Sequence, residues 1–185
     1  VRREWRAIRS LQQCSAEQFV GSFSNECALN ACAFEFNGAW LALALTTGGG
    51  FMPFHHSEHF QIKELRFLCH EPYMEINPAT AAALGVEEGD WVWIETRRGR
   101  IKQKANLTHG VHPRVVVTQR GWWYPERDMS DPELGGCLES NTNVLTSTSD
   151  EHCDPISGTW ANKGLLCKVY KVNGPDDHPD AKGGR

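Results

Sequence analysis

The sequence lacks several features that would assign it to a common functional class. No run of about eighteen apolar residues, the length of a membrane-spanning helix, is present, because polar residues interrupt the longest candidate, residues 27–45. Positive charge is not in excess, since 19 Lys and Arg face 23 Asp and Glu. The 7 cysteines form no C-x-x-C pair. We therefore expect no membrane span, no extended nucleic-acid-binding surface, no disulfide framework and no four-cysteine zinc site.

The same absences bear on compartment and domain number. An odd cysteine count favours a reducing compartment, and no apolar segment of an export signal follows Arg2-Arg3 soon after. We expect a cytoplasmic protein, or a periplasmic one if the chain belongs to an exported complex. With 185 residues, one core is expected, in residues 41–172. Residues 1–40 give no consistent structural signal, and residues 173–185 have the composition of a disordered tail.

The clearest structural pattern is the stretch 77–107. Asn77 is a typical N-cap of a short helix, and residues 91–96 are rich in the β-branched and aromatic residues of strands. Residues 97–99 read as a tight turn, after which residues 100–107 alternate polar and apolar side chains. The expected apolar face of the helix consists of Ala81, Ala82 and Leu84. The stretch predicts a helix followed by a two-stranded hairpin.

Other short segments predict more strands than helices. Strands are expected at 41–47, 73–76, 114–118 and 164–172. A helix is expected from the spacing of Ile62, Leu65 and Leu68, and a single helical turn at 139–146. About six short strands without a regular βαβ repeat favour a mainly β fold, a closed or nearly closed barrel with short helical insertions.

Three polar loops follow predicted strands or open the helical turn, at residues 46–57, 119–123 and 141–146. Backbone N–H groups at glycines and helix starts favour anionic oxygens, and Asn and Gln amides pair with the edge of a heterocycle. Together the loops suit a phosphate-containing heterocyclic cofactor. The polar and aromatic side chains at 119–125 form a dense cluster that could bind a flat ligand. The alternative is that Trp122, Trp123 and Tyr124 belong to the core and the Asn residues only cap turns. The residues alone leave both interpretations open.

A second chemical pattern is His55-x-x-Glu58-His59. On a helix, both histidines would share a face and bind Zn²⁺ while Glu58 activated water, as in one class of zinc hydrolase. Against this interpretation, Pro53 and the glycines at 48–50 make the approach a loop.

The ordered series of motifs resembles the C-terminal dinucleotide-binding domain of the molybdopterin oxidoreductases, the dimethyl sulfoxide reductase superfamily. The resemblance covers residues 41–172, and its loops look closest to the branch that contains acetylene hydratase and the thiosulfate or polysulfide reductases. The matching motifs include Leu45-Thr46-Thr47-Gly48, His56-Ser57, Ile76-Asn77-Pro78, Leu84-Gly85-Val86, Gly89-Asp90, Arg98-Gly99, Val115-Val116-Val117, Gly121-Trp122-Trp123 and Asn143-Val144-Leu145-Thr146.

The resemblance implies a double-psi β-barrel that closes over bis(molybdopterin guanine dinucleotide) carrying molybdenum or tungsten. The residues it assigns to the cofactor are Thr47, Gly48, His56 and Ser57 on the pterin and phosphate side, Gln119 and Trp123 on the second loop, Asn143 on the pterin, and Lys163 on a phosphate. Gly49 departs from the Arg that many relatives carry. The metal would be ligated outside this chain, so the chain alone is expected to be catalytically silent.

The expected partners are the remaining domains or catalytic chain of a molybdopterin enzyme, with an Fe–S electron-transfer subunit. Two alternatives from other functional classes remain. The barrel could serve as a protein-binding or regulatory module without cofactor, which predicts no need for the Asn143 side chain. The zinc hydrolase built on His55, Glu58 and His59 predicts stoichiometric zinc, lost on His59→Ala.

Overall fold

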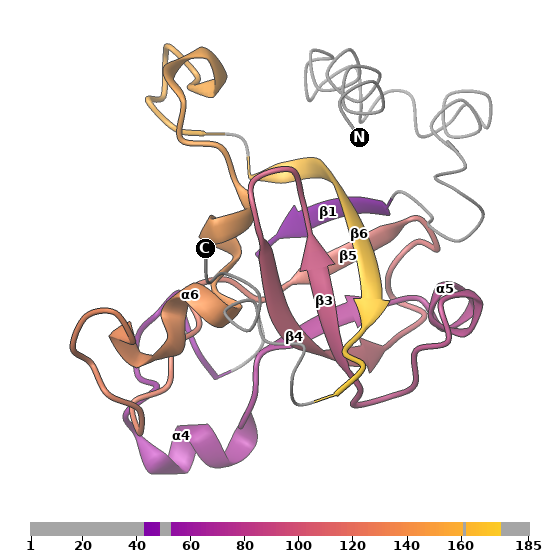
Figure 1. Ribbon diagram of the computed structural model, residues 1–185, viewed down its shortest axis with the longest axis horizontal. Helices are drawn as coiled ribbons and strands as arrows, with labels where there is room; N and C mark the ends of the chain where they lie inside the picture. Colours follow the sequence, from indigo (N-terminus) through magenta and orange to yellow (C-terminus); the bar gives the residue numbers. More distant parts are fainter. Residues whose placement is uncertain (1–42, 49–52, 161, 175–185) are drawn as a thin grey trace, which may run out of the picture.

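Figure 1 shows the computed structural model, which describes residues 43–48, 53–160 and 162–174. Six strands form one closed barrel in the order β1-β5-β2-β4-β3-β6. The strands are β1 (Leu43–Thr47), β2 (Tyr73–Ile76), β3 (Trp91–Glu95), β4 (Arg100–Leu107), β5 (Val115–Thr118) and β6 (Lys163–Lys171). The helical segments are α4 (Lys63–Leu68), α5 (Pro78–Ala83), η2 (Leu134–Gly136), α6 (Cys137–Ser140), η3 (Thr142–Leu145) and η4 (Asp150–His152). The predicted mainly β fold is confirmed; the expectations for residues 1–40 and for most of the C-terminal tail lie outside the described residues.

The strand pairing identifies the type of barrel. β1 pairs in parallel with β5, and β4 pairs in parallel with β2. β1 is antiparallel to β6, as β4 is to β3, while β2–β5 and β3–β6 complete the ring as antiparallel pairs. Exchanging each strand with the one three places along the chain therefore leaves every pairing unchanged. This internal two-fold relation of two interlocked halves is that of a double-psi β-barrel, as predicted.

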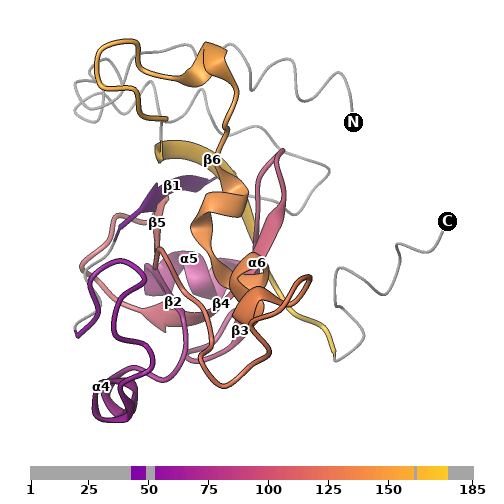
Figure 2. The same ribbon diagram turned by 90° about the vertical axis from the view of Figure 1, so that its left-hand side faces the viewer.

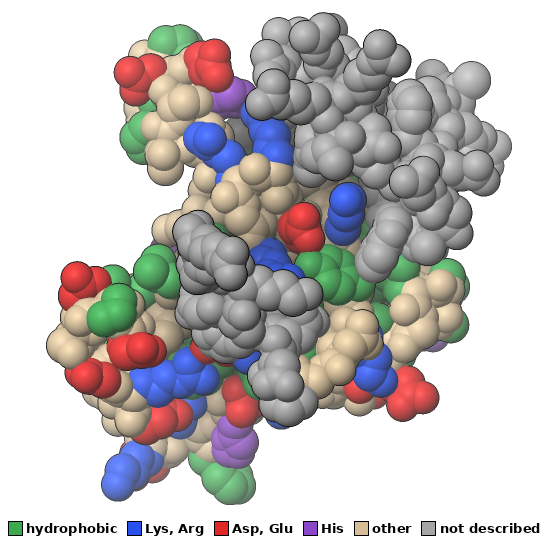
Figure 3. Space-filling model, in the orientation of Figure 1, with side chains coloured by type: hydrophobic (Ala, Val, Ile, Leu, Met, Phe, Trp, Pro, Cys, Tyr) green, Lys and Arg blue, Asp and Glu red, His purple; other side chains and the backbone are tan. Residues whose placement is uncertain are grey.

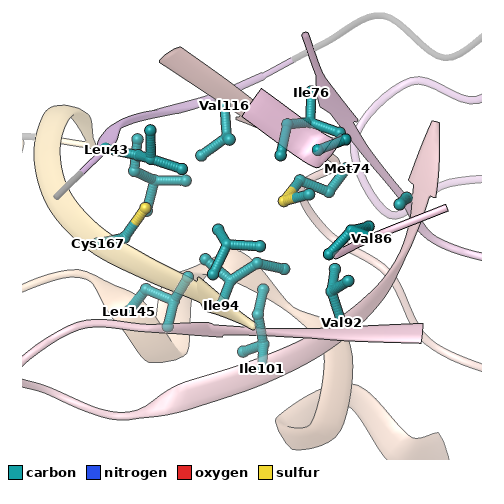
Figure 4. Close-up of a cluster of buried hydrophobic side chains, with 14 residues drawn as sticks. Leu43, Met74, Ile76, Val86, Val92, Ile94, Ile101, Val116, Leu145 and Cys167 are labelled. Atoms are coloured by element: carbon teal, nitrogen blue, oxygen red, sulfur yellow. The ribbon is translucent and has the colours of Figure 1, made fainter. Parts of the chain in front are cut away.

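The barrel interior is filled by alternating inward-facing side chains. β1 and β4 alternate buried and half-buried residues, as a strand with one face on the core should. The inward residues form one apolar cluster that includes Leu45, Met74, Ile94 and Ile101, each fully buried. Figure 4 shows the side chains of Met74, Ile94 and Ile101 converging from different walls of the barrel. Closure of the sheet leaves no free edge in the barrel, which suits a small core of this kind.

Helix α5 shows why the central stretch folds as predicted. The side chain of Asn77 accepts a hydrogen bond from the N–H of Ala79 at 3.0 Å, which caps the helix. Gly85 follows with φ 67°, a left-handed conformation that glycine adopts without strain. The expected apolar face was partly wrong: Thr80 and Ala81 are buried, whereas Ala82 is exposed. A six-residue helix contacts the barrel through one turn only, so Ala82 faces away.

The barrel has two distinct ends. Strands β1, β3 and β5 run in one direction and β2, β4 and β6 in the other. We call the end where β1, β3 and β5 finish the site end. The connections that follow these three strands start there, and their described residues are 48, 53–72, 96–99, 119–160 and 162. In Figure 1, α4, α6 and the arm of residues 147–160 lie to the left of the barrel and α5 to the right. Figure 2 looks onto the site end, with α6 in front, α4 below and the arm above.

Within the described ranges, no helix combines the length and the apolar character needed to cross a membrane.

Candidate functional site

The polar loops predicted from the sequence start together at the site end. The N–H of Gly48 donates to the carbonyl of Thr118 at 3.2 Å, so the connection after β1 begins beside the end of β5. Lys163, the first residue of β6, is in register with Thr46 of β1. Because parallel strands end on the same side of a sheet, Gly48, Gln119 and Lys163 converge there from three separate parts of the chain.

The loop that carries His56 and Ser57 is packed directly on the loop that carries Gly121 and Trp123. Gly121 has φ 72°, and a Cβ atom there would lie 2.9 Å from the carbonyl carbon of His56. The indole Nε1 of Trp123 donates to the Ser57 carbonyl at 2.8 Å. A side chain at position 121 would therefore push the two loops apart, which explains the glycine physically.

The aromatic residues of the second loop are mostly core. Trp122 is fully buried and its ring lies 4.7 Å from that of Phe60, with Tyr124 on its other side at 6.0 Å. Arg66 of α4 covers the Trp122 ring at 4.9 Å. The interpretation of this cluster as a platform for a flat ligand is therefore wrong for Trp122 and Tyr124. Burial also raises the pKa of Tyr124 to about 12, so its hydroxyl stays neutral.

Gln103 is the functional residue that sequence reasoning missed. It is fully buried in β4, and its Nε2 donates to the carbonyl of Gln119 at 2.8 Å and to that of Ser140 at 2.9 Å. The N–H of Gln119 donates back to Gln103 Oε1 at 3.3 Å. One amide thus connects the loop after β5 to α6. A signal was available, because Gln103 lies between Ile101 and Ala105 in the inward series of an alternating strand.

The side chain of Gln119 serves the protein's own hydrogen bonds. It is 3% exposed, and its Oε1 accepts from the N–H of Tyr73 at 3.3 Å. Thr47 is buried as well, at 4% exposure. The predicted proximity of Gln119 and Thr47 to a cofactor stays a prediction. Because both side chains are buried, they shape the site end and do not project from it.

Asn143 lies exposed on the η3 turn. The side chain of Asn141 accepts from the N–H of Asn143 at 3.1 Å and fixes the start of the turn. The hydroxyl of Thr96 donates to the Leu145 carbonyl at 2.9 Å and fixes its end. Within the described part of the chain, the side-chain amide of Asn143 makes no hydrogen bond, and the buried hydroxyl of neighbouring Thr142 has no partner.

The exposed candidates share this unengaged state. The side chains of His56, Ser57 and Lys163 are exposed and form no hydrogen bond with other described residues. Amide, imidazole, hydroxyl and ammonium groups are the groups that pair with a pterin edge and with phosphate oxygens. The chemistry of the residues present therefore fits a dinucleotide cofactor, and the assignment of Asn143, His56, Ser57 and Lys163 to it stays a prediction.

The zinc pattern does not lie on a helix. His55, Glu58 and His59 lie in turns before α4, and His56 and His59 have φ angles of 56° and 70°, which a helix excludes. The two histidines of the motif consequently do not share a helical face, which was the condition for the zinc interpretation. Among the described residues, no group of three or more His, Cys, Asp or Glu could hold a metal ion.

Comparison with known proteins decides the family. The model of the family described as Molydopterin dinucleotide binding domain matches residues 43–166, most of the described barrel. The chain belongs to this family. The predicted cofactor class, the molybdopterin dinucleotide of molybdenum and tungsten oxidoreductases, is thereby confirmed.

Relatives of this molybdopterin dinucleotide-binding domain are much longer proteins. It is 40% identical over 137 residues to dopamine dehydroxylase of Eggerthella lenta, covering 74% of this chain but 13% of that relative. It is 34% identical over 117 residues to a dimethyl sulfoxide reductase of Escherichia coli, covering 63% of this chain and 13% of the relative. The solved acetylene hydratase from Pelobacter acetylenicus superposes with a TM-score of 0.67 at 25% identity, over 82% of this chain and 20% of that chain.

These matches confirm the resemblance to the dimethyl sulfoxide reductase superfamily and to acetylene hydratase. In each of these relatives the matching region is a small part of the polypeptide, and the rest of the polypeptide forms other domains.

Proposed function

We propose that the site end closes over bis(molybdopterin guanine dinucleotide) carrying molybdenum or tungsten, in an oxidoreductase whose other domains ligate the metal. The observation that carries the proposal is the family match over residues 43–166, joined to a site end whose exposed polar side chains are unengaged. When bound, the cofactor supplies electron transfer at the metal. This chain's own residues hold and orient it: Asn143 through its side-chain amide, and Lys163 through its charge.

Helix α4 supports the proposal of a larger assembly. None of its residues is buried, and Phe67 and Leu68 expose 76% and 68% of their surface. Neighbouring apolar side chains exposed to this degree are typical of a surface that another part of a protein covers. We assign this face to the remaining domains or catalytic chain of the enzyme. An Fe–S electron-transfer subunit would be a further partner of that complex.

The test is the cofactor content of the protein co-expressed with its neighbouring chain. Metal would be measured by elemental analysis, and pterin by the fluorescence of the oxidised, released cofactor. We expect molybdenum or tungsten with about two pterins per complex, the stoichiometry of the bis form. Asn143→Ala should lose most of the pterin, because it removes an exposed amide whose hydrogen-bonding groups are all unengaged within the described residues.

A matched control separates this role from general damage. Asn173→Ala truncates another exposed asparagine, located after β6, and should retain the cofactor. Stoichiometric zinc without pterin would instead support the hydrolase, and its loss on His59→Ala would establish it. A complex with neither metal nor pterin would leave a barrel that binds protein.

A further inference from the structure

Two consecutive arginines at the tip of the β3–β4 hairpin contact the arm that follows Asn143. The Nη2 atom of Arg98 donates to Ser147 Oγ at 2.8 Å, and that of Arg97 lies 3.2 Å from Nε2 of His152. Ser149 lies between these partners: its Oγ is 3.1 Å from Ser147 Oγ and 2.7 Å from His152 Nδ1. We call Arg97, Arg98, Ser147, Ser149 and His152 the arginine–serine cluster.

The chemistry of the groups fixes part of this hydrogen-bond network. A guanidinium can only donate, so Nε2 of His152 accepts from Arg97, and the ring carries its proton on Nδ1, which donates to Ser149 Oγ. Ser147 Oγ accepts from Arg98 and from the backbone N–H of Ser149, and one of the two serine hydroxyls donates to the other. The proton of the second serine hydroxyl then has no acceptor among the described residues.

The two arginines of the cluster have no carboxylate partner. Neither Arg97 nor Arg98 contacts a carboxylate in the ranges that the structure describes. The nearest carboxylate contact is that of Glu151, whose side chain is 78% exposed and lies 3.5 Å from His152 Nδ1. Two adjacent guanidinium groups with surplus N–H and O–H donors require acceptor oxygens and negative charge. Phosphate oxygens supply both, and arginine pairs with them in a bidentate manner.

Firm contacts hold the cluster in place. The hairpin is tied to η3 by the Thr96–Leu145 hydrogen bond, and a Cβ atom on Gly99 would lie 3.1 Å from Val144 Cγ1. Within the arm, Trp160 Nε1 donates to the Ser149 carbonyl at 3.1 Å and joins its two ends. Figure 3 shows basic side chains and a histidine gathered where the arm meets the barrel. The cluster therefore occupies a fixed position directly after the turn that carries Asn143.

We propose that the arginine–serine cluster is an anion site that binds a phosphate group. The phosphate group could come from either of two sources. One is a phosphate of a guanine nucleotide, and this version of the proposal rests on the proposed function. The other is inorganic phosphate, which is independent of it. Arg97 and Arg98 neutralise the anion, and the serine hydroxyl whose proton lacks an acceptor donates it to the anion. No covalent step is involved.

The test is titration of the full 185-residue chain with sodium phosphate and, separately, with guanosine 5′-diphosphate. Calorimetry at constant ionic strength is suitable, because salt screens exposed charges. Arg97→Gln and Arg98→Gln should each weaken binding about tenfold or more, since each removes a charged donor, and Ser147→Ala should weaken it less. The control Lys63→Gln removes one charge from the exposed start of α4 and should leave affinity within about twofold.

The two probes separate the sources. Tighter binding of the nucleotide than of phosphate, with the same arginine dependence, assigns the site to a nucleotide; equal affinities assign it to phosphate itself. Absence of saturable binding by either probe, or arginine variants that bind like Lys63→Gln, would overturn the proposal. Its failure is distinct from failure of the cofactor proposal, because pterin content and its dependence on Asn143 are measured on the co-expressed complex.

Discussion

Inside the barrel, the buried side chains of β4 at positions 101 and 105 are apolar and join a cluster of similar residues. At the site end, the buried groups are of another kind: Gln103, Gln119 and Ser140 are polar, and the side chain of Gln103 bonds to the backbone of the other two. Apolar burial is non-directional and tolerates changes of shape, whereas hydrogen bonds fix orientation. The barrel therefore supplies stability, and the polar layer above it determines where the site loops lie.

The most damaging change should be one inside the barrel. Ile101→Ala removes a fully buried side chain and leaves a cavity, so we expect the free energy of unfolding to fall by about 2–5 kcal/mol. Denaturant unfolding followed by circular dichroism measures this. Ile156→Ala is the control, because Ile156 is 96% exposed and its truncation should have almost no effect.

A change in the polar layer should cost somewhat less and act more locally. Gln103→Met keeps the volume but leaves the carbonyls of Gln119 and Ser140 without their donor, which should cost about 2–3 kcal/mol. Amide hydrogen exchange should speed up around Gln119 and Ser140 more than in β1 or β6. Uniform acceleration across the barrel would contradict a positioning role, and Gln61→Met on the exposed surface provides the baseline.

The ion pairs beside the polar layer should make stability depend on pH. Burial alone would raise the pKa of Glu139, but hydrogen bonds from Lys102 and Arg127 outweigh it and lower the pKa. A lowered folded-state pKa stabilises the protein above the unfolded value of about 4.3, and the benefit disappears as pH falls through the folded value. Glu139→Gln should cost about 1–2 kcal/mol at pH 7 and converge with wild type in acid. If the thermal midpoints of Glu139→Gln and wild type differed by the same amount at pH 7 and in acid, the stabilising role of the Glu139 carboxylate would be refuted. The control is Glu133→Gln at an exposed position, which should leave the thermal midpoint unchanged.

The smallest effect should come from one hydrogen bond between the two site loops. Trp123→Phe removes the donor to the Ser57 carbonyl but keeps an aromatic ring at this position, for a loss of about 0.5–1 kcal/mol. Only the loop that contains Ser57 should become less ordered. This would be detected as faster amide hydrogen exchange in residues 55–60, with little change in β4. If global stability falls as far as in Gln103→Met, the indole contributes to the core more than to the loop.

Most of the barrel could be predicted from the sequence because its signals are local. Alternation in β4, the N-cap Asn77 and the glycine after α5 each specify a conformation within a few residues. The burial of Trp122 could not be predicted in the same way. The sequence of an aromatic cluster after a strand is the same whether its rings face a ligand or pack in the core. The ring that packs on Trp122 is that of Phe60, 62 positions earlier in the chain, and only tertiary folding brings the two together.

The site end was harder to predict for the same reason. The three loops were correctly grouped, because each follows a strand or opens a turn, but Gln103 acts on Gln119 and Ser140 across 16 and 37 positions. The pairing of Arg97 with His152 spans 55 positions. Such contacts depend on strand register, which no single segment specifies.

The interchange of strands three places apart has a kinetic consequence. Neither half of the chain can complete its own sheet, since each parallel pair takes one strand from each half, β1 with β5 and β4 with β2. Contacts of this kind close long loops before they gain stability, which slows folding. β6 touches both β1 and β3, so the ring closes only when the last strand of the barrel has been made. During synthesis, residues 163–171 must therefore leave the ribosome before the closed barrel, and with it a complete surface for binding a cofactor, can form.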